Sequence, residues 1–314
     1  MTTDRTMQVV LVTLGLLAAG VVAALQPLFY TADNLLNILR QSVPLVILAV
    51  GQSYVLISRG LDLSQGGVVV VTSVAFALLS QHTGIAVAIP LVIMLGASVG
   101  LVNGSLVAGF GLSPFVVTLG IGSVLQGAAL VASSGQPVFQ VPAGFFLPYY
   151  GTALGIPIPF FVAFAITITA GLVLDGSVLG RSIRAVGSNA RAAFLSGLAV
   201  KRTELLAYFL CATTTSIGAI MLAARISSGH PTAGSDMALQ AIAAAVIGGV
   251  SLFGGRGSVY GAAAGAVFLT AIANALNLLN VSSFIQLIAV GLIIIIAAVI
   301  DKVRRDAVQI LGGL

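Results

Sequence analysis

The sequence is poor in charge, and it contains no tryptophan, one cysteine and two histidines. Only 7% of its 314 residues are charged, whereas 59% are apolar, and the mean hydropathy is +1.15. A soluble domain of this size needs about 25% charged residues to cover its core. The composition therefore excludes a soluble globular protein and predicts an all-α polytopic membrane protein.

The residues for several kinds of chemistry are also missing. The single cysteine, Cys211, can form no intrachain disulfide and lies in an apolar run, so we expect it to be a packing residue. No Gly-Lys pair is present, which excludes a Walker A loop for ATP phosphates. The two histidines, His82 and His230, and the scattered acids lack metal-ligand spacing, so we expect no metal and no cofactor.

Enzymatic activity is not expected either. The run Gly96–Gly100 matches G-x-S-x-G, but it lies within an apolar span rather than on a strand-to-helix turn. The net charge of +5 is expected to belong to cytoplasmic loops rather than to a nucleic-acid-binding face.

Apolar runs fill most of the chain and predict about ten transmembrane helices. The predicted spans are Gln8–Leu28, Val43–Ser58, Val68–Gln81, Ile85–Val102, Phe115–Ser133, Phe160–Leu174, Leu205–Ile226, Met237–Val250, Val259–Leu279 and Phe284–Ile300. An even count with both termini in the cytoplasm leaves only Arg40 and Arg225 outside among the 13 basic residues. This arrangement obeys the positive-inside rule.

Two of these spans, Val68–Gln81 and Met237–Val250, are short for a ~30 Å hydrocarbon core. Both adjoin glycine clusters, so each half of the chain is predicted to carry a Gly-broken segment within an internal pseudo-repeat. The glycines either line a path or let helices pack closely, and both interpretations stay open for the broken segments. Close packing is the better interpretation for the glycines spaced by four residues. These are Gly96, Gly100, Gly104, Gly261 and Gly265.

The predicted spans carry polar groups that do not ionise at neutral pH. No carboxylate, lysine or arginine lies in mid-span, which favours a neutral polar solute such as a polyol over proton coupling. The alternative is that these side chains join helices to each other. They are Gln52, Ser53, Tyr54, Thr118, Gln126, Asn274, Asn277 and Gln286.

One segment, residues 175–204, holds seven of the 21 charged residues in 30 positions and lies between two apolar spans. It is predicted to be a cytoplasmic loop. Asn189 or Ser188 can cap a short helix start there, Ala192 and Ala193 leave a low surface for docking, and Gly197 can end the turn.

Ordered motifs between Gln41 and Asp301 resemble the sugar-type ABC importer permeases, and in particular the ribose-transporter branch. They include Gly60–Gly66 (GLDLSQG), Asn103–Gly104, Pro114–Gly120 (PFVVTLG), Ala185–Asn189 (AVGSN), Pro231–Gly234 (PTAG), Leu239–Ala244 (LQAIAA), Val246–Gly249 (VIGG), Gly254–Gly257 (GGRG) and Asn277–Ser283 (NLLNVSS). Spacing of the Ala-Ala-x-x-x-Gly kind in the cytoplasmic loop is also typical of these permeases.

The resemblance implies that residues 1–314 form a single transmembrane permease domain with the ABC importer permease fold in the bacterial inner membrane. It also implies a second permease chain as a homodimer, cytoplasmic ABC ATPase subunits, a periplasmic sugar-binding protein and surrounding membrane lipid. Residues 181–204 become the coupling loop. Its expected contact residues are Gly187, Asn189, Arg191, Ala192, Ala193 and Gly197.

The sequence departs from the family at two positions. Arg191 stands where many importers have the acidic residue of their Glu-Ala-Ala loop, and Gln65 stands where related permeases often have a small apolar residue. A path or gate is expected among the polar and glycine positions of the two halves. These are Gln52, Tyr54, Asp62, Thr118, Gly248, Gly249, Asn274 and Asn277.

Two charged pairs admit simple interpretations. Arg59 and Asp62 are expected to form a loop ion pair, with a gate latch as the alternative. Arg225 and Asp236 flank a predicted periplasmic loop and could dock a binding protein, although solvated loop charges are the default. A gradient-driven carrier is the alternative function from the sequence, and an intramembrane hydrolase is a third.

Overall fold

The computed structural model describes residues 26–139 and 141–282, and eight of the residues between 284 and 299. Within this part the chain is almost entirely helical, with one two-stranded hairpin. In chain order the elements are η1 (Pro27–Tyr30), α2 (Ala32–Ile57), α3 (Gln65–Thr83), α4 (Ile85–Gly104), η2 (Ser105–Gly109), α5 (Pro114–Ala132), α6 (Ala143–Tyr150), β1 (Thr152–Ala153), β2 (Ile156–Pro157), α7 (Ile158–Gly176), α8 (Val178–Ser188), α9 (Ala190–Leu195), α10 (Val200–Ile226), α11 (Met237–Ile247) and α12 (Val259–Leu278).

Seven of the described helices are long and apolar enough to cross a membrane: α2, α3, α4 with η2, α5, α7, α10 and α12. Eight of the predicted spans lie in the described part. The one that has no long helix is Met237–Val250, which contains only the 11-residue α11. The predicted spans Gln8–Leu28 and Phe284–Ile300 fall largely outside the described residues, as do Arg5, Lys302, Arg304 and Arg305. The polytopic all-α class is confirmed, and the count of about ten stays a prediction.

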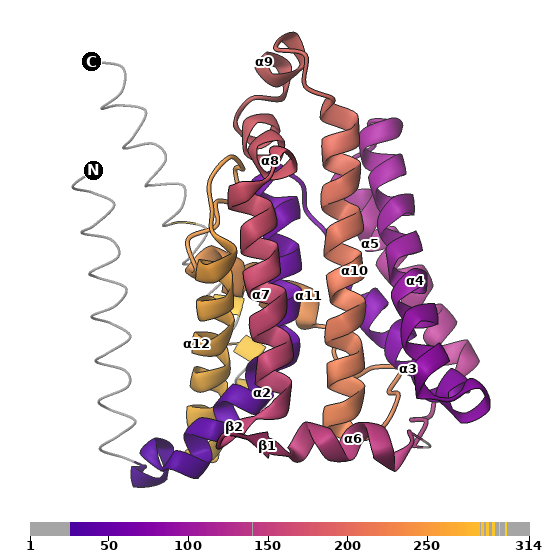
Figure 1. Ribbon diagram of the computed structural model, residues 1–314, viewed down its shortest axis with the longest axis vertical. Helices are drawn as coiled ribbons and strands as arrows, with labels where there is room; N and C mark the ends of the chain where they lie inside the picture. The colour runs from indigo at the N-terminus through magenta and orange to yellow at the C-terminus, as the bar shows by residue number, and fades with distance from the viewer. Residues whose placement is uncertain are drawn as a thin grey trace.

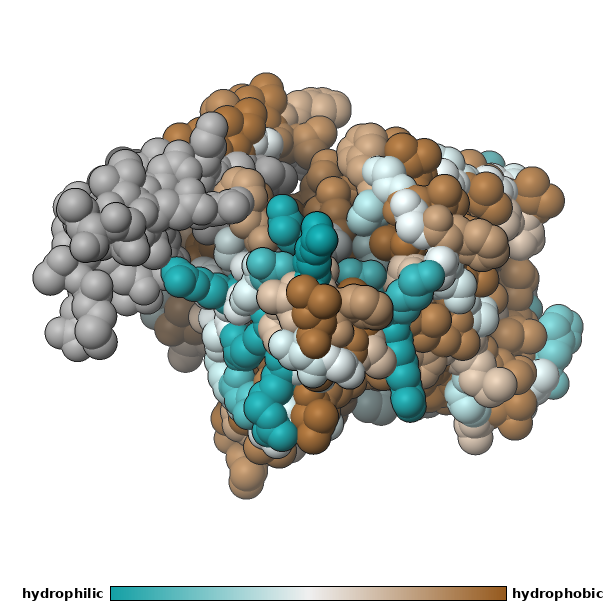
Figure 2. Space-filling view, turned by 90° about the horizontal axis from the view of Figure 1, so that it is seen from above, coloured by the Kyte–Doolittle hydropathy of each residue, from teal (hydrophilic) through white to brown (hydrophobic). Residues whose placement is uncertain are grey.

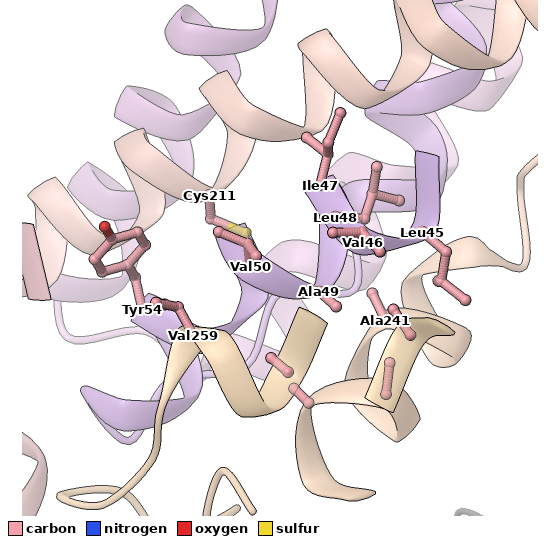
Figure 3. Close-up of a cluster of buried hydrophobic side chains, with 14 of the residues drawn as sticks. Leu45, Val46, Ile47, Leu48, Ala49, Val50, Tyr54, Cys211, Ala241 and Val259 are labelled. Carbon is pink, nitrogen blue, oxygen red and sulfur yellow. The ribbon is translucent and has the colours of Figure 1, made fainter. Parts of the chain in front are cut away.

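Helix α2 is the centre of the bundle. Every residue from Ser42 to Ile57 is buried, and α2 packs against α7, α10, α11 and α12. Figure 3 shows its apolar side chains between Cys211 of α10 on one side and Ala241 and Val259 of the last helices on the other. A helix that is apolar on all sides is stable only when neighbouring helices surround it, which explains this central position.

Small residues set the closest helix contacts. A Cβ atom added at Gly96, Gly100 or Gly104 of α4 would collide with α10, and one at Gly261 or Gly265 of α12 would collide with α11. The predicted packing role of these glycines is confirmed, because only glycine allows the helix backbones to approach so closely.

The glycine cluster that adjoins the predicted span Val68–Gln81 consists of Gly60, Gly66 and Gly67. Gly60 lies between α2 and α3, but Gly66 and Gly67 do not break a helix, because both lie inside α3, which runs for 19 residues without interruption. A Cβ at Gly66 would overlap the Ser235 carbonyl, and one at Gly67 would meet Gly122, so these glycines serve close packing. In the second half α11 does end before Gly248, and Gly249, at φ +87°, donates to the Val246 carbonyl to close the helix.

The two ends of the bundle are formed by different elements (Figure 1). Helices α8 and α9 lie at one end, and α6 with the β1–β2 hairpin lies at the other. Arg40 donates to the carbonyl of Tyr150 in α6, and the Tyr150 hydroxyl donates to the carbonyl of Arg225. These two arginines therefore share the α6 end, away from the basic residues of α8 and α9, as the sequence predicts.

Candidate functional site

Helix α9 forms the tip of the charged segment and is built as the sequence predicts. Asn189 caps it, because its Oδ1 accepts from the backbone N–H of Ala192 at 3.0 Å. Gly197, at φ +81°, reverses the chain and donates to the carbonyl of Phe194 at 2.9 Å. A side-chain cap and a left-handed glycine at the two ends define a single short helix.

The exposed face of α9 differs from the expected one. Ala193 is only 5% exposed and faces the chain itself, so the expectation that it forms a docking surface is wrong. Arg191 and Ala192 are exposed, and so are Phe194 (68%) and Leu195 (77%). Exposed Phe194 and Leu195, two large apolar side chains at an end rich in charge, mark a contact surface for a partner. The sequence does not single out these two residues.

Helix α8 connects α9 to the bundle and is itself held by Arg184 (Figure 1). The guanidinium of Arg184 pairs with the Asp175 carboxylate at the end of α7 and donates to the Gly257 carbonyl at 2.9 Å. Gly187, near the C-terminal end of α8, is buried rather than on the docking surface. Figure 2 looks down on this end and shows hydrophilic side chains around a small apolar surface. We name Arg191, Ala192, Phe194 and Leu195 the coupling surface.

A buried polar cluster lies where α3 begins. The Asp62 carboxylate accepts from the Ser64 backbone N–H at 2.9 Å and from the Ser64 hydroxyl at 2.6 Å. Asn103 of α4 donates to the same hydroxyl at 2.8 Å. All three residues have no exposed surface, and Asp62 does not pair with Arg59, which is exposed. The expected loop ion pair is therefore wrong.

The cluster continues toward α2 and α10. Gln65 donates to the carbonyl of Leu48 at 3.1 Å and to the hydroxyl of Thr215 at 2.9 Å. The Cys211 thiol lies 3.5 Å from Oε1 of Gln52. These contacts join the first two long helices to α10 inside one chain, which is the structural role that buried amides most often have in membrane proteins.

The other predicted path residues are spread over the bundle. Tyr54 donates to the carbonyl of Ala170 in α7 at 2.7 Å, and Thr118 accepts from the backbone N–H of Leu63 at 3.0 Å. Asn274 exchanges two hydrogen bonds with Asn34 at the far end of α2, and Asn277 is exposed. The structure does not bring these residues to one site within a chain, and their place on a path stays a prediction.

Burial raises the pKa of Asp62 above its usual range, although the two hydrogen bonds from Ser64 act in the opposite direction. An acid with a raised folded-state pKa binds more protons when folded, so its contribution to stability falls as pH rises from its unfolded pKa through the folded one. We expect Asp62→Asn, which keeps an acceptor for Ser64, to gain thermal stability over the wild type as pH increases from 5 to 8.

Thermal unfolding of the purified permease in detergent across that pH range measures this difference. Asp236→Asn is the matched control, because Asp236 is exposed and only accepts from Gln240. A stability difference between Asp62→Asn and the wild type that did not change with pH would show that folding does not raise the pKa of Asp62, and the prediction would be wrong.

Comparison with known proteins places the chain among transport proteins. Residues 34–298 match the family described as branched-chain amino acid transport system / permease component. The chain is 37% identical to the ribose import permease protein of Escherichia coli K12 over 295 residues, which is 92% of each chain. No solved structure matches the chain.

Two further relatives are named for other sugars. The D-allose transport system permease protein of Escherichia coli K12 is 30% identical over 276 residues, 87% of this chain and 85% of the relative. The L-arabinose ABC transporter permease protein of Azospirillum brasilense is 32% identical over 281 residues, 89% and 83% of the two chains.

Proposed function

Because this chain belongs to the family described as branched-chain amino acid transport system / permease component, we propose that it is the membrane subunit of an ATP-driven importer of a ribose-like monosaccharide. The observation that carries the proposal is the match to a ribose import permease over 92% of both chains. Relatives named for allose and arabinose support a small sugar as the solute class.

Energy for transport comes from partner subunits. The chain has no Gly-Lys pair for a P-loop, so ATP is bound and hydrolysed by cytoplasmic ABC ATPase subunits. The coupling surface on α9 is the contact for them, because it places exposed apolar side chains beside Arg191 at the charged end of the bundle. Arg191 stands at the position of the acidic residue typical of many importers, so this chain presents a cation to its ATPase partner at that position.

The sugar path lies between two copies of this chain in the bacterial inner membrane. Non-ionising groups hydrogen-bond hydroxyls without the cost of a buried charge, so Gln52, Tyr54, Thr118, Asn274 and Asn277 remain the proposed polar contacts. All of them except Asn277 are buried within one chain, so helix movement during transport must expose them to the sugar. A periplasmic sugar-binding protein delivers the sugar at the α6 end. We propose that both termini lie in the cytoplasm.

Co-purification and transport together test the proposal. The tagged permease, expressed with the ATPase and binding protein encoded beside it, is expected to retain one ATPase domain per permease chain. In proteoliposomes the complex should import radiolabelled D-ribose, D-allose or L-arabinose only with ATP and the binding protein. Uptake by the permease alone, driven by the sugar gradient, would establish a carrier instead.

A further inference from the structure

The predicted topology leaves two arginines on the outer side of the membrane, Arg40 of α2 and Arg225 of α10, and the structure brings them together. The Arg225 guanidinium donates to the carbonyl of Gln41, the residue that follows Arg40, at 3.4 Å. Two cations from distant parts of the chain therefore share one place at the α6 end, although like charges repel each other.

Helix α6 supplies two tyrosines that hold this arginine pair. The Arg40 guanidinium donates to the carbonyl of Tyr150 at 3.3 Å, and the Tyr150 hydroxyl donates to the carbonyl of Arg225. The Tyr149 hydroxyl donates to the carbonyl of Arg40 at 2.9 Å. Burial raises the pKa of Tyr149 above its usual range, and Arg225 and Arg40 both oppose this shift. Both positive charges therefore act at the same hydroxyl.

The described part of the chain provides no counter-ion for the pair. Neither arginine forms an ion pair with a carboxylate of the described residues. Each guanidinium has five N–H donors, and for each of them the same residues provide one acceptor, a neutral carbonyl. Nε of Arg40 is buried and has no hydrogen-bond partner among them. Two partly exposed cations with donors to spare form a site for an anion.

The pair lies at the level of a membrane surface. Arg225 is in the last turn of α10, which is long and apolar enough to cross a membrane. Helix α6 runs across the end of α10 rather than along it (Figure 1). Tyrosine side chains are typical of the head-group region of a bilayer. Leu147 is 62% exposed and Tyr150 is 50% exposed, so α6 offers apolar surface for an acyl chain beside the two charges.

We propose that Arg40 and Arg225 bind the phosphate of an anionic phospholipid in the leaflet on the α6 side. The planar guanidinium groups donate to the phosphate oxygens. A head group with a net negative charge balances the arginine pair, whereas a zwitterionic head group brings a cation of its own. Carboxylates of a docking protein have similar chemistry, but both arginines are partly buried and held by α6, which suits a lipid beside the helix better than a partner above it.

Thermal unfolding of the full permease in detergent, with increasing amounts of added phospholipid, measures the binding. Phosphatidylglycerol should raise the unfolding temperature and phosphatidylcholine should not, because only the first has a net negative head group. Arg40→Gln and Arg225→Gln are each expected to raise the phosphatidylglycerol concentration for half-maximal stabilisation about tenfold, because each removes a charge-assisted contact. Arg202→Gln is the matched control, since Arg202 is exposed at the opposite end of α10. An equal rise with the two lipids would reject the anionic site.

A structural role for the arginines is separated by the unfolding temperature without lipid. Arg40→Gln also removes the bond to the Tyr150 carbonyl, so this variant can lose stability of its own. A lower temperature without lipid, combined with the wild-type increment from phosphatidylglycerol, would show a merely structural role and reject the proposal. Arg225→Lys keeps the charge but not the fork, and it should bind phosphatidylglycerol better than Arg225→Gln and more weakly than the wild type.

Two further measurements distinguish the source of the anion. Inorganic phosphate should not stabilise the wild type at these concentrations, because it has no acyl chain for the apolar surface of α6. Equal stabilisation by inorganic phosphate, lost in the same variants, would assign the arginines to a soluble anion and overturn the lipid site. Normal phosphatidylglycerol binding by Arg40→Gln and Arg225→Gln, together with loss of sugar-binding-protein capture, would assign the pair to protein docking instead.

Discussion

Replacing Leu195 with aspartate is expected to abolish sugar-stimulated ATP hydrolysis while leaving the permease folded. Leu195 is 77% exposed, so the permease loses no packing of its own. In the complex, an unpaired charge in a close-packed contact costs roughly 3 kcal/mol, which weakens binding by about a hundredfold. The measurements are the pull-down of ATPase subunits and their stimulated activity, with thermal stability of the isolated permease as the check on folding.

Two further variants make this experiment specific to the α9 surface. Ala193→Asp should destabilise the permease itself, because Ala193 is buried within the chain. Leu154→Asp introduces the same charge at a residue that is 96% exposed in the hairpin at the opposite end, and it should retain the ATPase subunits. Wild-type pull-down and stimulation in Leu195→Asp would remove α9 from the coupling mechanism.

The second large effect is expected at the contact of α11 with α12. A Cβ at Gly248 would overlap the carbonyl of Gly261. The carbonyl belongs to the backbone of α12, so no change of side-chain rotamer can relieve the overlap. Overpacking of this kind costs roughly 1–3 kcal/mol and occasionally more. We therefore expect Gly248→Ala to lower the yield and the thermal stability of the permease, and transport in proportion to folded protein.

Gly249 separates steric overlap from backbone strain. It is adjacent to Gly248, has φ +87° and has open space where a Cβ would lie, so Gly249→Ala should cost only about 1–2 kcal/mol of left-handed strain. Gly127→Ala in α5, with open space and an ordinary helical backbone, should be close to neutral. Stability of Gly248→Ala equal to that of Gly127→Ala would contradict the close contact of α11 with α12.

Span positions could be predicted because hydrophobic length is a local property of the sequence. The boundaries were less accurate where polar residues continue a helix. Val43–Ser58 was predicted, but α2 begins eleven residues earlier at Ala32, across Asn34, Asn37 and Arg40. These residues lower the local hydropathy, yet Asn34 is stabilised in the helix by its hydrogen bonds to Asn274 and to the Phe29 carbonyl.

The coupling segment shows the same division between local and distant contacts. The sequence predicts Ser188 or Asn189 as the cap and Gly197 as the end of a short helix, because both roles depend on neighbouring backbone groups, and the structure selects Asn189 as the cap. The direction in which Ala193 points was not predictable. It depends on how α8 and α9 pack against the rest of the chain.

The sequence by itself determined the membrane class, most of the apolar helices, the capped helix in the charged segment and the family resemblance, since each is encoded by composition or by residues close along the chain. Only the tertiary structure decided that Asp62 is bonded to Ser64 rather than Arg59, that Gly66 and Gly67 pack inside an unbroken helix, and that Gly187 touches Ile57 and Gly255. The glycine contacts depend on which backbones approach each other from distant parts of the chain, such as Gly66 with Ser235 and Gly187 with Ile57, and a glycine has the same local signature wherever its partner lies. Asp62 bonds to a residue only two positions away, but its burial beside Asn103 of α4 depends on the packing of distant helices.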